Sequence, residues 1–91
     1  LALARLCGWS AYHTHDSRRS SPGFPDIVFV RPPRIIYAEL KTQRGRVRPE
    51  QEYWIQMLRD CGQETYLWRP SDWDEITGVL GVIGERRRGD E

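Results

Sequence analysis

Two carboxylates and one lysine are spaced along the sequence in a way that could support phosphate chemistry. Asp26 begins the run DIVFVR, and Glu39 and Lys41 lie near the end of the run RIIYAELKT. Successive side chains of a strand alternate between its faces, so Glu39 and Lys41 share a face. A divalent cation between the two carboxylates would polarise a phosphoryl oxygen and activate a water molecule. Lys41 would either orient that water or stabilise charge that grows on the phosphate.

The two prolines at 32–33 predict the tip of a hairpin that brings these charges together. If Arg31 opposes Arg34 across that tip, Asp26 opposes Glu39, with Cβ atoms about 5 Å apart. Carboxylates at this distance repel each other, so we interpret the pair as a metal site. The alternative is a surface salt-bridge cluster. The opposite face of the hairpin is wholly apolar and is expected to join the core; it comprises Ile27, Phe29, Ile36, Ala38 and Leu40.

The elements needed to position this site follow from the apolar periodicity and the turn residues. The expected helices span residues 1 to 7, 49 to 61 and 71 to 80, and the expected strands span 9 to 15, 26 to 31, 34 to 42 and 64 to 68. Pro49 suits a first helical position, Gly62 a helix stop, and Ser71 an N-cap. The order α-β-β-β-α-β-α predicts an α/β fold with a mixed sheet flanked by helices.

The length and composition indicate one folded domain over residues 1–91. Thirty-eight per cent of the residues are hydrophobic, which is too much apolar material for a disordered chain, and no apolar run could span a membrane. We do not interpret the opening LALARLCGW as a secretory signal; it looks like the end of a helix that begins earlier. Cys7 and Cys61 lack a CxxC or CxxH partner, so we expect free thiols, with Cys61 buried. A reducing, cytoplasmic compartment fits this expectation.

The distribution of charge predicts a surface that meets a polyanion. Residues 18–48 hold eight basic and two acidic side chains, whereas residues 49–91 hold five basic and ten acidic ones. We expect contacts to such a polyanion, for example a DNA backbone, from the arginines on either side of the carboxylates, which are Arg18, Arg19, Arg44, Arg46 and Arg48. A solvated, arginine-rich surface that binds nothing is the alternative.

Several segments together resemble a known nuclease family. GFPD at 23–26 and AELK at 38–41 look like the PD-(D/E)xK nuclease signature, and TQRGRVRPEQEYWIQMLRDCG resembles the virus-type replication-repair nuclease (VRR-NUC) domain. WRPSDWDEI at 68–76 resembles that family's final strand and helix, so the likeness covers residues 8 to about 80. An isolated PD or ExK is a weak signal, but the ordered set is specific. The resemblance implies a restriction-endonuclease-like α-β-β-β-α-β core.

The resemblance also implies an activity and roles for individual residues. The protein would be a DNA endonuclease that uses Mg²⁺ or Mn²⁺ and no small-molecule cofactor. Asp26, Glu39 and the backbone carbonyl of Leu40 would hold the metal, Lys41 would be the catalytic lysine, and Gln51 would support Lys41 or the water. A homodimer, selective cutting of branched DNA such as four-way junctions, a role in DNA repair, and a viral or bacterial origin are further expectations. A viral protein would act in the host cytoplasm.

One departure from the family motivates a different hypothesis. Such domains tend to carry an acidic residue in the first helix, whereas no acidic residue precedes Asp16 here. The chain could then be a catalytically inactive nucleic-acid-binding module that keeps the nuclease fold. A domain that binds only proteins is a third, weaker alternative.

Other residues have a functional and a plainer interpretation. His13 and His15 could contact phosphate or metal, but an outward-facing strand position is the favoured interpretation. Gln51 could simply be an exposed residue at a helix start. For the large aromatic side chains Trp54, Trp68 and Trp73, a core or interface position is favoured over stacking on bases.

Overall fold

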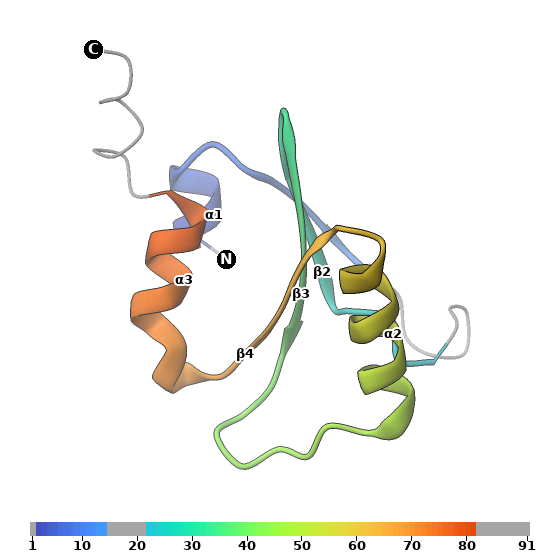
Figure 1. Ribbon diagram of the computed structural model, residues 1–91. Helices are drawn as coiled ribbons and strands as arrows, with labels where there is room; N and C mark the ends of the chain where they lie inside the picture. Colours follow the sequence, from blue (N-terminus) through green and yellow to red (C-terminus); the bar gives the residue numbers. More distant parts are fainter. Residues whose placement is uncertain (1, 15–21, 82–91) are drawn as a thin grey trace.

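A four-stranded sheet lies between one helix on one face and two helices on the other (Figure 1). The computed structural model describes residues 2–14 and 22–81. Its elements are α1 (Ala2–Leu6), β1 (Ser10–His13), β2 (Ile27–Arg31), β3 (Arg34–Leu40), α2 (Pro49–Asp60), β4 (Glu64–Trp68), the 3₁₀ turn η1 (Pro70–Asp72) and α3 (Trp73–Leu80). The strands lie side by side in sequence order, and the predicted α/β class with a mixed sheet is confirmed.

The hairpin of β2 and β3 has the predicted register. Arg31 pairs with Arg34 at the tip and Ile27 pairs with Ala38 near the other end. Extending that register by one residue sets Asp26 opposite Glu39. The register is well specified because slipping it by one residue would turn the apolar side chains away from the core. Four residues of the predicted core face are buried (Ile27, Phe29, Ile36 and Ala38), whereas Leu40 is partly buried and packs against them.

The fourth strand joins the sheet by a parallel crossover. After β3 the chain leaves the sheet, α2 crosses one face, and β4 then pairs parallel to β3 (Figure 1). A parallel connection needs a crossover of this length, and here the 12-residue helix supplies it. The carboxyl ends of β3 and β4 therefore meet at one edge, where Lys41 N–H still donates to Trp68 O across 2.9 Å. This edge carries the candidate site.

The far end of the hairpin is tied to the ends of α1 and α3. Arg31 lies over the Trp9 ring, 4.4 Å from its centroid, and donates to Cys7 O across 2.8 Å. Trp9 Nε1 donates to Leu80 O across 2.7 Å. Arg34 forms a two-pronged contact with Glu64, at 2.9 and 2.7 Å. Arginines near helix carboxyl ends are favourable because unpaired carbonyls gather there.

The structure overturns some sequence-based expectations. Ser71 does not cap the last helix: it lies within η1, and α3 begins at Trp73 after Asp72. Cys61 is exposed, whereas Cys7 is the buried thiol. The first strand is shorter than expected, and all of its residues are exposed. Within residues 2–14 and 22–81, no helix has the length and hydropathy needed to cross a membrane.

Candidate active site

Asp26 and Glu39 come together at the open end of the hairpin, as their register requires. Leu40 N–H donates to Asp26 Oδ2 across 3.0 Å, so the aspartate is fixed against the backbone of β3. Thr14 N–H donates to Asp26 O across 3.0 Å and continues the β1–β2 pairing beyond the strands. Both neighbouring strands therefore hold Asp26 in place beside Glu39.

Glu39 is a buried carboxylate with an unsatisfied oxygen. Only 2% of the residue is exposed, and Oε1 accepts no hydrogen bond from the part of the chain that the structure describes. Burial raises the pKa of Glu39, and the nearby charge of Asp26 raises it further, against the opposing effect of Lys41. Leaving a buried oxygen unpaired costs free energy, so such groups are often functional.

Gln51 connects this carboxylate to the start of α2. Its Nε2 donates to Glu39 Oε2 across 2.8 Å, and its Oε1 accepts from Arg48 N–H across 2.9 Å. Because a carboxylate only accepts and a backbone N–H only donates, this orientation of the amide is the one that satisfies both partners. Gln51 is 6% exposed, so the interpretation as an exposed helix-start residue is wrong.

Lys41 lies on the same side of the sheet as Glu39. Its Nζ is 3.6 Å from Glu39 Oε2, and only 13% of its side chain is exposed. A cation at this distance partly compensates the buried negative charge. The ammonium group therefore stands where it could meet a group bound next to the two carboxylates.

Gly23 places the segment that carries Asp26 against the first turn of α2. Its φ is +92°, and a Cβ at this position would lie 2.5 Å from Glu50 O and 3.0 Å from Gln51 N. Only glycine combines that backbone conformation with so close an approach. The close approach of Gly23 to α2 thus brings the GFPD segment, which carries Asp26, next to the helical turn that carries Gln51. The sequence alone did not reveal this contact.

The basic segment after Lys41 projects from the same edge of the sheet. Arg44 and Arg46 are exposed, and Arg48 is exposed but lies 3.4 Å from Glu50 through its Nε atom. His13 is exposed on β1. Three other residues that the sequence singled out, Arg18, Arg19 and His15, lie outside the described residues.

Two of the arginines that contributed to the basic middle segment have structural contacts instead. Arg31 and Arg34 lie at the hairpin tip, where they contact carbonyl groups and Trp9. The tip is at the opposite end of the hairpin from Asp26 and Glu39. Conversely, Arg69 reaches the basic segment from the end of β4, although no pattern in the sequence pointed to it. The charge count alone could not distinguish these positions.

The aromatic residues divide between the core and the surface. Trp68 is in the core, as expected, and stacks on Tyr66 with ring centroids 5.0 Å apart. Trp54 is half-buried and packs edge-on against Phe24. Trp73 is 53% exposed, so of the expected core or interface positions the core is excluded for it, and an interface position stays a prediction.

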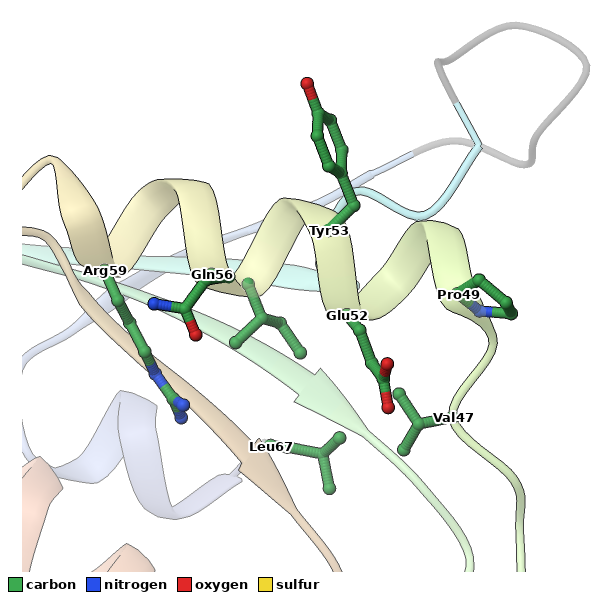
Figure 2. A pocket seen from close by; sticks show the side chains of 8 residues that line it. Val47, Pro49, Glu52, Tyr53, Gln56, Arg59 and Leu67 are labelled. Carbon is green, nitrogen blue, oxygen red and sulfur yellow. The ribbon is translucent and has the colours of Figure 1, made fainter.

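A pocket of about 560 Å³ lies elsewhere, between α2 and the outer edge of β4 (Figure 2). Val47, Glu52 and Leu67 converge on it, whereas the Tyr53 ring points away. Neither Asp26, Glu39 nor Lys41 lines this pocket. It is therefore separate from the candidate site, which is a cluster of side chains at the strand ends.

The site, as far as the structure describes it, contains two carboxylates, Asp26 and Glu39. Across residues 2–14 and 22–81, no group of three His, Cys, Asp or Glu side chains is placed to hold a metal ion. A metal bound here would therefore complete its shell with backbone carbonyl, water or phosphate oxygens. Mg²⁺ commonly does so, since it keeps several waters and binds through one or two carboxylates.

Comparison with known families finds a match over most of the chain. The VRR-NUC domain matches residues 2–71, a range that includes Asp26, Glu39, Lys41 and Gln51. The matched range ends before α3 begins. No curated protein matches the chain.

Proposed function

The chain belongs to the VRR-NUC domain family, and we propose that it hydrolyses DNA phosphodiester bonds with Mg²⁺ or Mn²⁺ held between Asp26 and Glu39. Membership of this family implies a nuclease-type function. The observation that supports the finer proposal is the buried Glu39 carboxylate, which lies near Asp26 and has one oxygen without a hydrogen bond from the described residues. A divalent cation would satisfy that oxygen and remove the repulsion between the two carboxylates.

The donor set fits a hard cation. Glu39 Oε1 and the Asp26 carboxylate are oxygen ligands of the kind that Mg²⁺ prefers. The Leu40 carbonyl is the proposed third ligand: Leu40 N–H points toward Asp26, and the N–H and C=O of one strand residue face the same side. Such an ion would polarise the phosphate and lower the pKa of a bound water.

The remaining side chains have positioning and electrostatic roles. Gln51 fixes Oε2 of Glu39, so that Oε1 is the oxygen left for a ligand. Lys41 Nζ, next to the same carboxylate, would orient the attacking water or stabilise negative charge on the phosphate. A site held by hydrogen bonds in advance loses less energy to rearrangement when the substrate reacts.

The substrate is proposed from charge. Arg44 and Arg46 are exposed in the segment that leaves Lys41, and arginines in such positions commonly contact DNA phosphates. Arg48, and Arg18 and Arg19 outside the described residues, complete the proposed set. Contacts to phosphate carry no sequence information, so selectivity for branched DNA such as four-way junctions would arise from DNA shape.

A cleavage assay tests the proposal. We would incubate the protein with duplex, flapped and four-way-junction DNA in Mg²⁺ or Mn²⁺, beside Lys41→Ala and the matched surface variant Glu52→Gln. Wild type and Glu52→Gln should cut, chelator should stop both, and Lys41→Ala should lose about 100-fold or more in rate. Equal cleavage by Lys41→Ala, or none by the wild type with either metal, would contradict the proposal.

A non-catalytic DNA-binding module is the second candidate. The presence of only two carboxylates at the described site favours it. It predicts salt-sensitive DNA binding that chelator leaves unchanged, with no cleavage under either metal. A domain that binds only proteins would show no salt-sensitive DNA binding at all.

A homodimer is part of the proposal because paired incisions need two sites at a fixed separation. Sedimentation equilibrium over a range of concentrations would measure the association. A species that stays monomeric at the highest concentration would contradict this part and leave the chemistry of each site untouched.

A further inference from the structure

The loop of residues 42–48 connects two parts of the candidate site. Its first residue follows Lys41, and its last residue, Arg48, gives its N–H to Gln51 Oε1. Between these ends the exposed arginines Arg44 and Arg46 project into solvent. An unsupported loop of this kind would have to be ordered when DNA binds, at a cost in conformational entropy.

One side chain from β4's end holds the first half of this loop. Arg69 Nη1 donates to Thr42 O and to Gly45 O, each across 2.8 Å, and lies 3.4 Å from Gln43 O. Gly45 N–H also donates to Thr42 O across 3.2 Å, which closes a turn. Arg69 therefore binds both ends of one tight turn.

Two further contacts support the same turn. Gln43 Nε2 donates to Ser71 Oγ across 3.0 Å, and Ser71 N–H donates to Gln43 Oε1 across 3.1 Å. A Cβ on Gly45 would lie 2.9 Å from Thr42 Oγ1 and 3.6 Å from Lys41 Cδ, so the turn packs directly on the lysine stem. Five residues of the loop and of the segment after β4 (Thr42, Gln43, Gly45, Arg69 and Ser71) thus form one hydrogen-bonded unit beside Lys41.

We propose that Arg69 is a positioning residue for DNA binding, which holds the 42–45 turn so that Arg44 and Arg46 meet the phosphate backbone. The inference rests on the proposed function of the site. Carbonyl oxygens occupy the Nη1 donors of Arg69, and these contacts fix the guanidinium within the protein. The positive charge of Arg69 does not itself contact DNA. Instead, Arg69 orders the loop in advance, which lowers the cost of ordering it when DNA binds.

A double-mutant cycle separates these two roles. We would measure binding of a labelled duplex and a labelled four-way junction by fluorescence anisotropy in chelator, so that cleavage plays no part. Arg69→Ala should weaken binding about tenfold, as should the loop variant Arg44→Ala/Arg46→Ala. Adding Arg69→Ala to the loop variant should weaken binding by no more than about twofold, because the two changes remove the same interaction.

Two single variants serve as controls. Arg59→Ala removes a comparable arginine–carbonyl contact, from Arg59 Nε to Thr65 O at 3.1 Å, on the other side of β4. It should leave binding unchanged within about twofold. Arg69→Lys keeps the charge but not the planar guanidinium, so it should fall between wild type and Arg69→Ala.

The outcomes are distinguishable. Additive losses in the cycle, or wild-type binding by Arg69→Lys, would show that Arg69 acts through its charge and would overturn the inference alone. Absence of DNA binding by the wild type would overturn the proposed function and the inference with it. Hydrogen exchange of the Gly45 amide gives a second measurement, without DNA: it should be faster in Arg69→Ala than in Arg59→Ala. Equal exchange in these two variants would contradict the positioning role.

Discussion

The buried carboxylate of Glu39 is held by Gln51, whose Nε2 donates to Glu39 Oε2 across 2.8 Å. The other end of the same amide accepts from Arg48 N–H, so the amide bridges the sheet and the entry to α2. This contact links the position of a helix to the orientation of a proposed metal ligand. Substitutions at Gln51 can therefore test the site without changing any ligand.

We predict that Gln51→Ala lowers the cleavage rate by about 10- to 100-fold and weakens the apparent affinity for metal, because Glu39 loses the contact that orients it. Metal titrations of the cleavage rate would measure both effects. Gln56→Ala is a matched control, since Gln56 lies on the same helix and its amide donates to the exposed Asp60. Equal rates for the two variants would show that the Gln51–Glu39 contact has no part in catalysis.

We predict that Glu39→Gln abolishes cleavage and, without metal, stabilises the protein near neutral pH. The folded-state pKa of Glu39 is raised, chiefly by burial and then by Asp26, so folding penalises the ionised carboxylate. The penalty is absent below the unfolded-state pKa and complete above the folded-state pKa. Urea unfolding across a pH series should show the advantage of Glu39→Gln vanishing in acid.

Added metal should make the wild type more stable than Glu39→Gln, the reverse of the order expected without metal. A cation that binds only the folded wild type at 100 times its Kd adds about 2.7 kcal/mol, which is a Tm increase of many degrees for a small domain. Glu39→Gln should show little of this increase. If Mg²⁺ and Mn²⁺ raise the Tm of both proteins equally, the ion does not bind at Glu39.

We predict that Gly23→Ala destabilises the protein by more than about 2 kcal/mol and reduces cleavage. The added methyl group would enter the backbone of α2's first turn, 2.5 Å from Glu50 O, at a residue whose φ is +92°. Gly62→Ala is the control, because its φ is +82° but, apart from its chain neighbours, no atom of the described residues lies within 4 Å of the new Cβ. It should cost only the conformational penalty of about 1 kcal/mol. Comparable unfolding free energies for the two variants would contradict the proposed contact.

We predict that Glu64→Gln lowers the unfolding free energy by up to about 1 kcal/mol at neutral pH. Hydrogen bonds from Arg34 hold the pKa of Glu64 below its ordinary value. The side chains are 38% and 34% exposed, so solvent screening keeps the effect small. The lowered pKa means that this stability is present above the unfolded-state pKa and is lost as the pH falls through the folded-state pKa.

Urea unfolding of wild type and Glu64→Gln over a pH series would check this. The two curves should converge in acid, whereas Glu52→Gln, at an exposed residue of α2, should track the wild type throughout. A constant difference in unfolding free energy between wild type and Glu64→Gln at every pH would mean that the Arg34–Glu64 ion pair makes no pH-dependent contribution to stability.

The parts of the fold that sequence could predict are those governed by local pattern. The pairing of Arg31 with Arg34 followed from a two-proline tip, and alternation along the strands then placed Asp26 opposite Glu39. The strand at 64–68 was bounded correctly because a glycine precedes its apolar run and a proline follows it. Patterns of this kind involve residues close in sequence.

What the sequence missed around the candidate site involves partners that are distant in sequence. Ser71 precedes three acidic residues and looks like a helix cap, but Gln43, 28 positions earlier, binds it within η1. Arg69 lies in the acidic half of the sequence, and its contacts to the loop are 24 to 27 positions away. Gly23 is explained only by the backbone of α2. Neither charge counting nor periodicity can detect such contacts.

The hairpin tip, with Arg31 and Arg34 anchored on Trp9 and on the ends of α1 and α3, lies about 17 Å from Asp26 along β2. Much of the tertiary anchoring is thus remote from the residues proposed to react. Substitutions distant from each other generally add without coupling. The loop proposed to meet the substrate can therefore diversify over evolutionary time, and with it the proposed selectivity for DNA structure, while the anchored end keeps the chain folded.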